Sequence, residues 1–305
     1  MLNIHPVLGS TWVIETAMAY LPFYKLNERD IVLLDSGFYS TDRQELTETL
    51  RAHDFCVKGI ICSHAHMDHA GNISHLCGIY NCRVAAHIIE AAIAATADGY
   101  RRRYGIHNSD GKGGVEECFT ATDIIMPRTE KLAFCGAEFG ILHLPGHSGG
   151  HIGIVTPDDV AYLGDVLMGF PQLAGSKMPT TQFLRLDLES KRSLHSLRAE
   201  RYIVAHKVIS EDIHGLIDAN IRCIEGKLQE ILAALKGTPT RGEWLMAWCE
   251  RQNLHMRSDR SFAILEYGFN SAVTYLEETG RIRSRRVNGN RRFMRKSAGG
   301  GEASR

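Results

Sequence analysis

Apolar and polar positions fall into short blocks along the chain, and these blocks predict a mixture of strands and helices. Residues 57–63 (VKGIICS) form a continuous apolar run, which is typical of a strand buried on both faces. Similar runs, bounded by glycine or aspartate, predict strands at 10–16, 30–38, 82–87, 131–167 (several short ones) and 200–208. Helical spacing predicts helices at 41–54, 72–80, 87–105 and 213–235. This alternation predicts an α/β or α+β fold.

The pattern changes after residue 236. Helical spacing at 240–253 and 269–280 is followed by two alternating stretches around Asn288-Gly289-Asn290, which predict a hairpin. Two helices and a hairpin resemble a winged helix. We therefore expect four parts, and their ranges are 1–212 (main domain), 213–236 (linking helix), 237–296 (winged-helix-like domain) and 297–305 (disordered tail).

The distribution of charge supports this division. The net charge is zero, but residues 237–305 carry 13 Lys and Arg against 7 Asp and Glu, whereas residues 1–236 carry 22 against 28. We find no basic leader with an apolar run, and no apolar stretch of about 18 residues that could span a membrane. Eight scattered cysteines complete the expectation of a cytoplasmic protein with reduced thiols and no membrane association. Among them, Cys77 and Cys82 are interpreted as small buried hydrophobes rather than metal ligands.

Residues 63–72 (SHAHMDHAGN) follow the predicted strand at 57–63 and crowd metal-binding side chains together. On extended backbone, His64 and His66 point to the same side. Asp68 and His69 follow where the chain turns, so they can face a second point nearby. Imidazole and carboxylate ligands suit zinc, iron or manganese. This one loop can therefore begin two metal sites.

Three further candidates follow predicted strands or lie between glycines. They are His147 in LPGHSGGH, Asp165 in AYLGDVL and His206 in YIVAHK. Loops beyond strand ends are where open sheets place their sites. In order and in placement, these residues and the 64–69 loop resemble the metallo-β-lactamase superfamily over about residues 5–210.

The resemblance implies a four-layer αβ/βα sandwich with two divalent metal ions, expected to be zinc, with iron or manganese as alternatives. It implies that the first metal is bound by His64, His66 and His147, the second by Asp68, His69 and His206, and that Asp165 bridges both. Asp35 matches an aspartate that positions a ligand; the alternative is an ordinary aspartate at a strand end. Family members that do redox chemistry with two irons usually carry glutamate at position 66, so the histidine favours hydrolysis.

Two cations lower the pKa of a bridging water to about 7, and the resulting hydroxide can attack a carbonyl or phosphoryl centre. Asp68 is the candidate catalytic residue that orients this nucleophile. We expect a small-molecule substrate, namely an ester, thioester or lactone. Thioesterases of the glyoxalase type share the ligand set, but residues 204–212 do not show their glutathione-binding residues convincingly. A different class, an iron-dependent oxidoreductase or a non-hydrolytic binding protein, stays open.

Two basic regions are candidates for choosing the substrate. Arg101, Arg102, Arg103 and Tyr104 can meet an anionic group, or can simply form a solvated helix end. The tail carries eight cations without an acid among them: Arg281, Arg283, Arg285, Arg286, Arg291, Arg292, Arg295 and Lys296. Such a cluster can neutralise phosphates, so an RNA phosphodiesterase is the alternative function. The tail can equally dock a protein or a second copy of the chain, giving a homodimer.

Overall fold

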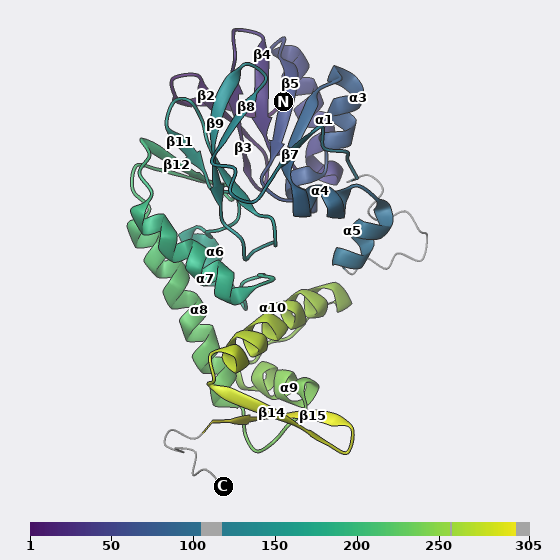
Figure 1. Cartoon of the computed structure of the whole chain (residues 1–305), viewed down its shortest axis with the longest axis vertical. Coiled ribbons are helices and arrows are strands. Elements are labelled where there is room, and N and C mark those ends of the chain that lie inside the picture. Colours follow the sequence, from purple (N-terminus) through teal and green to yellow (C-terminus); the bar gives the residue numbers. More distant parts are fainter. Residues whose placement is uncertain (105–117, 257, 297–305) are drawn as a thin grey trace.

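The structure is a computed structural model that describes residues 1–104, 118–256 and 258–296. Two sheets lie face to face, helices cover their outer faces, and a C-terminal group of helices ends in a hairpin (Figure 1). These layers confirm the predicted αβ/βα sandwich. None of the helices in the described ranges has both the length and the apolar character needed to cross a membrane.

The first sheet is antiparallel in its first half and parallel in its second. Its strands, in spatial order, are Asn3–Leu8 (β1), Thr11–Glu15 (β2), Tyr20–Lys25 (β3), Asp30–Leu34 (β4), Cys56–Cys62 (β5), Arg83–His87 (β6) and Asp123–Ile125 (β7). Strands β4 to β7 run parallel, so their carboxyl ends meet at one edge. That edge is where the loops carrying chemistry are expected.

The second sheet follows the order β13-β12-β11-β10-β9-β8. Its strands are Lys131–Phe134 (β8), Ala137–His143 (β9), Ile152–Val155 (β10), Val160–Tyr162 (β11), Arg201–Val204 (β12) and Val208–Ser210 (β13). Strands β11 and β12 are parallel, whereas β9 and β10 form a hairpin. Three loops, between β9 and β10, after β11 and after β12, therefore start or end at the same edge of this sheet.

Helices pack on both outer faces of the sandwich. Those of the first 235 residues are Tyr39–Ala52 (α1), Met67–Ala70 (α2), Ile73–Tyr80 (α3), Ile88–Ala94 (α4), Ala97–Tyr104 (α5), Phe170–Gly175 (α6), Leu184–Ser193 (α7), the 3-10 turn Leu194–Ser196 (η1) and His214–Ala234 (α8). Leu46 and Leu50 of α1 and Leu76 of α3 join the core under the first sheet. Leu216 and Ile217 of α8 pack under the second. The apolar face of each helix thus closes one layer.

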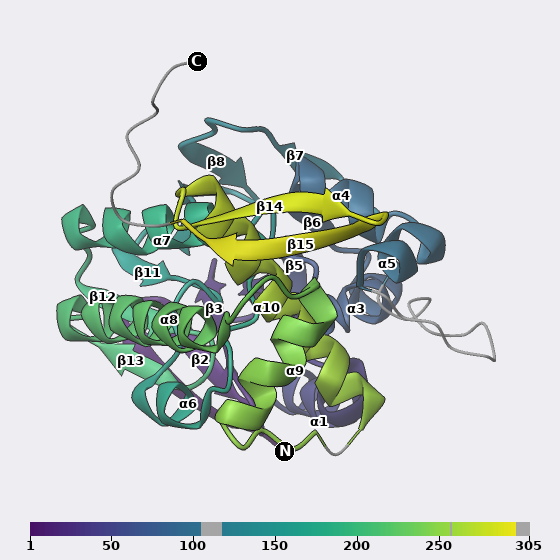
Figure 2. The ribbon, with the colours of Figure 1, turned by 90° about the horizontal axis from the view of Figure 1, so that it is seen from below.

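The C-terminal unit contains Arg241–Arg251 (α9), Asp259–Glu278 (α10), Ile282–Val287 (β14) and Asn290–Arg295 (β15). Aromatic side chains of α9, α10 and β15 form its centre, and seen from below the hairpin lies in front of α10 (Figure 2). The two predicted helices and the hairpin are confirmed. The winged-helix assignment and the domain boundaries stay predictions, and residues 297–305 lie outside the described part of the chain.

Two local expectations need correction, and one strand was not predicted. The single helix predicted over 87–105 is interrupted after α4, where Thr96 Oγ1 accepts a hydrogen bond from the amide of Gly99 at 3.0 Å and starts α5. Helix α10 begins ten residues earlier than predicted, at a capping box formed by Ser258 and Ser261. Strand β3 lies outside the predicted strands, and its Pro22 pairs with Val13 in the sheet.

Candidate metal centre

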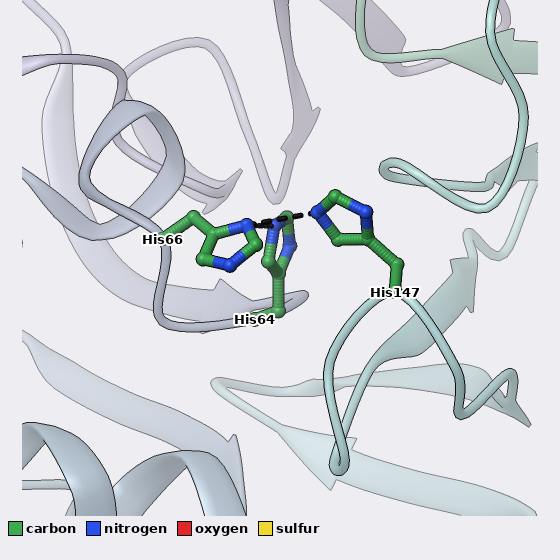
Figure 3. A group of neighbouring side chains, drawn as sticks. All are labelled: His64, His66 and His147. Atoms are coloured by element: carbon green, nitrogen blue, oxygen red, sulfur yellow. Dashed lines mark hydrogen bonds between the residues drawn. The ribbon is translucent and has the colours of Figure 1, made fainter. Parts of the chain in front are cut away.

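The first cluster consists of three histidines from two loops. Nε2 of His64 lies 2.9 Å from Nδ1 of His66, and Nε2 of His147 lies 2.8 Å from that same atom (Figure 3). One potential ligand atom from each ring lies within 4.8 Å of the others. The loop after β5 supplies His64 and His66, and the loop between β9 and β10 supplies His147. Residues 81 positions apart thus converge because two sheet edges meet.

The second cluster adjoins the first and is centred on Asp165. Oδ1 of Asp165 lies 3.3 Å from Nε2 of His69, and Oδ2 lies 3.4 Å from Nε2 of His206. Asp68 completes the group, with Oδ2 3.7 Å from Nε2 of His69 and 3.8 Å from Nε2 of His206. Oδ2 of Asp165 also lies 3.5 Å from Nε2 of His147 in the first cluster. Asp165 therefore occupies the position between the clusters that the resemblance implied.

Asp35 orients two of these histidines. Its buried carboxylate accepts hydrogen bonds from Nδ1 of His69 at 2.7 Å and from the hydroxyl of Tyr162 at 2.6 Å. It also accepts from the amide and the hydroxyl of Ser63, both at 2.6 Å. Since the Ser63 hydroxyl donates to Asp35, it accepts from Nδ1 of His64 at 3.0 Å. Both imidazoles then direct Nε2 toward the centre, and orienting ligand rings in this way is the role of an outer carboxylate in metal sites.

Asp35 holds this position with a left-handed backbone. Its φ is 68°, a region that glycine, aspartate and asparagine tolerate better than other residues. The amide of Asp35 donates to the carbonyl of Ile61 at 3.0 Å, so the turn after β4 is attached to β5. The expectation that Asp35 positions a ligand thus agrees with its contacts.

Glu90 connects the two ligand loops, and sequence reasoning missed it. Its fully buried carboxylate accepts from the amide of Ala65 at 2.9 Å on one oxygen. On the other oxygen it accepts from the hydroxyl of Ser148 and the amide of Gly150, both at 2.8 Å. A glutamate within the apolar run HIIEAAIAA was the available signal, because a buried carboxylate needs several donors.

Two further histidine contacts fix the second cluster. Nδ1 of His206 donates to the carbonyl of Met18 at 3.2 Å, which directs Nε2 toward Asp165. Nε2 of His151 accepts the amide hydrogen of Asp165 at 3.0 Å. His151 therefore holds the backbone of a cluster residue without belonging to either cluster.

Burial and charge set the protonation of these groups. Burial lowers the pKa of His64, and burial together with His66 lowers the pKa of His147 to about 3, so both rings are neutral at pH 7. The hydrogen bond to Asp165 raises the pKa of His206 to about 9. Burial opposes ionisation of Asp165, but the neighbouring His69 and His206 hold its pKa well below its ordinary value.

The donor set fits a pair of divalent cations. A tetrahedral site with metal–ligand distances of about 2.1 Å places its ligand atoms about 3.4 Å apart, and the contacts in both clusters range from 2.8 to 3.8 Å. Nε2 of His69 and Oδ1 of Asp165 are buried and form no hydrogen bond with any residue that the structure describes. Buried polar atoms without partners are costly. This His/Asp cluster suggests divalent metal binding.

Comparison with known proteins decides the family. The model of the Metallo-beta-lactamase superfamily matches residues 9–206, about two thirds of the chain. The chain belongs to this superfamily. Residue 206, where the match ends, is the last histidine of the second cluster. The resemblance read from the spacing of the histidines and aspartates is therefore confirmed.

The curated proteins to which this chain is similar are named as hydrolases. The chain is 27% identical over 143 residues to hydroxyacylglutathione hydrolase GloC of Haemophilus influenzae, covering 46% of this chain and 63% of that protein. It is 29% identical over 126 residues to hydroxyacylglutathione hydrolase of Shewanella loihica, covering 41% and 40%. The chain thus spans less than two thirds of the length of these relatives.

Solved structures of the superfamily share the fold. A metallo-beta-lactamase family protein from Thermus thermophilus has a TM-score of 0.71 at 20% identity, covering 95% of this chain and 100% of that chain. A beta-lactamase domain protein from Burkholderia ambifaria has a TM-score of 0.70 at 15% identity, covering 96% and 94%. At these identities the likeness concerns the fold alone.

Two sets of candidate residues remain, namely the segment 101–104 and the cysteines at 77 and 82. Nη1 of Arg101 pairs with Oδ1 of Asp98 at 3.6 Å on α5, as expected of a helix surface. The side chains of the other three candidates of that segment, residues 102–104, are outside the described set. Sγ of Cys77 lies 3.1 Å from Sγ of Cys82, and neither thiol joins a potential metal group among the described residues.

Proposed function

We propose that this chain is a metal-dependent hydrolase of small esters, thioesters or lactones. The observation that carries the proposal is the pair of adjoining clusters that share Asp165. Membership of the superfamily and the names of the curated relatives support a metallo-hydrolase, and those names favour a thioester. Zinc is the proposed metal, because three imidazoles and mixed imidazole–carboxylate sets are its usual ligands.

The residues of the centre have separate roles in this proposal. Divalent cations held there supply an acidified water, whose pKa falls to about 7. Asp68 is partly open to solvent, with 27% of its side chain exposed. From that position its carboxylate can orient the attacking water and accept its proton. Glu90 keeps the loops of His66 and His147 at a fixed separation, so that the ligands need not reorganise.

Metal quantification with a substrate panel tests this function. We expect two zinc ions per chain and turnover of at least one of a thioester, a lactone and an ester. His66→Ala should lose metal and turnover together. Asp68→Ala should lose turnover more than metal, because it also loses the proton acceptor. Near-normal turnover in folded, metal-assayed variants would sink the assignment, and a single iron with oxygen-dependent activity would favour the oxidoreductase instead.

The hairpin supports a second candidate, an RNA phosphodiesterase. Arg285 lies opposite Arg292 across the strands, and Arg286 lies opposite Arg291. Like charges directly opposite each other are destabilising, so an anionic partner would relieve them. Part of this charge is already neutralised, because Arg291 pairs with Glu277 at 2.7 Å.

The test of RNA binding uses point substitutions. Deleting residues 281–296 would remove Ile282 and Phe293, which are buried in the C-terminal core. Arg283→Glu with Arg285→Glu instead changes two exposed side chains on the face of the hairpin opposite Phe293. Salt-sensitive RNA binding that is lost in this double variant would support the second candidate. Unchanged binding would remove the tail from consideration.

A further inference from the structure

Two exposed apolar side chains lie on either side of Gly149, in the loop that carries His147. Ile89 is 42% exposed and Phe183 is 44% exposed. A Cβ atom at Gly149 would lie 3.4 Å from Cε2 of Phe183 and 3.6 Å from Cγ2 of Ile89. These side chains, which come from α4 and from the residue before α7, therefore form one surface over Gly149. We call Ile89 and Phe183 the Gly149 patch.

The Gly149 patch is fixed relative to the metal centre. The amide of Phe183 donates to the carbonyl of Gly146 at 2.9 Å. Ile89 immediately precedes Glu90, whose carboxylate holds both ligand loops. Gly149 follows His147 by two residues, and two residues of chain span at most about 7 Å. The patch therefore lies within reach of a substituent on a substrate bound at His147.

Two charged side chains near the patch and the centre are paired within the described part of the chain. Lys207 follows the last histidine of the second cluster, and its Nζ lies 3.1 Å from Oε1 of Glu15. Arg185 lies two residues after Phe183, and its Nη2 lies 3.0 Å from Oε2 of Glu278. A carboxylate on a substrate would have to compete with these acids, whereas an uncharged chain needs no counter-ion.

Resting on the proposed hydrolase function, we infer that the Gly149 patch binds the apolar acyl chain of a neutral ester or thioester. Exposed apolar side chains that gather beside a site of polar chemistry are typical of a binding surface. The acyl chain is the part of such a substrate that gains from apolar contact, because the leaving group departs with negative charge. A glutathione thioester, whose tripeptide carries two carboxylates, is a poorer fit.

A series of acyl chains on one leaving group measures this preference. The metal-loaded full chain is assayed with acetyl, butanoyl, hexanoyl and octanoyl thioesters of N-acetylcysteamine. We expect kcat/KM to rise about two- to fourfold per methylene until the patch is covered, the upper figure being that of a fully buried methylene. Phe183→Ala and Ile89→Ala should flatten the rise. Ile79→Ala, which changes another exposed isoleucine (38%) near the end of α3, should keep it.

Two further measurements make the result decisive. Hexanoyl glutathione is compared with hexanoyl N-acetylcysteamine, and a tenfold preference for glutathione would overturn the inference, as would a flat chain-length series. Binding of the non-hydrolysable S-ethyl and S-hexyl thioethers of N-acetylcysteamine is titrated in parallel. Tighter binding of the hexyl compound, lost in Phe183→Ala, upholds the patch even if no ester is hydrolysed. Equal binding of the two thioethers would overturn the inference about the patch and would leave the proposed hydrolase function untouched.

Discussion

The metal centre and the C-terminal unit bury opposite kinds of side chain. At the centre, Asp35, His64 and Glu90 are fully buried, and each has several hydrogen-bond partners. In the C-terminal unit the largest buried side chains are Trp244 and Trp248, whereas the cations of the hairpin are not buried. Buried polar groups are costly unless they are paired, and their pairing fixes positions more than it adds stability. The buried groups of the first region therefore fix the positions of side chains, whereas those of the second stabilise the fold by apolar packing.

Asp165→Ala should produce the largest effect, because it removes the side chain shared by both clusters. Bound metal ions stabilise the transition state by several kcal/mol, and the loss of this stabilisation should lower turnover by about 10³-fold or more. Metal content per chain and kcat/KM on the best substrate are measured together. A variant that keeps both metals and most of its turnover would show that the clusters do not act as one centre.

Trp244→Ala tests the contribution of apolar packing to the stability of the C-terminal unit. Trp244 is fully buried, packs against Phe269 and Phe293, and donates from Nε1 to the carbonyl of Ile231 at 2.8 Å. The truncation should cost about 3–5 kcal/mol of unfolding free energy, as measured by chemical denaturation. Zinc content of the folded variant should stay at the wild-type value. A coupled loss of metal would mean that the two regions are not independent.

Asp35→Asn tests whether the carboxylate of Asp35 is needed to orient the metal-binding histidines. Asparagine suits the left-handed backbone, but its amide nitrogen cannot accept the bonds from His69 and Tyr162. Zinc affinity should fall about 10- to 100-fold, as measured by competition with a chelator. Thr47→Ala, at a hydroxyl of α1 that bonds to the carbonyl of Arg43, is the control and should leave the affinity unchanged. Equal affinity of Asp35→Asn and the wild type would contradict the role of Asp35.

Arg283→Ala should have the smallest effect. Arg283 is exposed on the outer face of the hairpin, opposite Met294. Surface substitutions of this kind usually change the free energy of unfolding by less than about 0.5 kcal/mol, and turnover of a small ester should not change. A large loss of either would imply that the hairpin contributes to the centre.

Much of the centre could be predicted from the sequence because its ligands lie at strand ends. His64, His66 and His69 occupy one loop, and Asp165 and His206 follow strands whose apolar pattern is plain. The family match confirmed that interpretation.

The supporting contacts could not be predicted. The apolar run around Glu90 indicates a buried carboxylate, but its partner Ala65 and the partner of Tyr162, Asp35, lie 25 and 127 residues away, and local patterns do not identify them. Strand β3 was likewise not predicted, and its place between β2 and β4 is seen only from the pairing of the strands. The Gly149 patch arises only when α4 and the start of α7 meet.

The turn at Asp35 joins two demands in one amino acid. The backbone at φ 68° admits glycine, asparagine and aspartate with least strain, and four donors require a carboxylate. Glycine meets the first demand only, and glutamate the second only. Few replacements at position 35 can therefore keep both the turn after β4 and the orientation of His64 and His69.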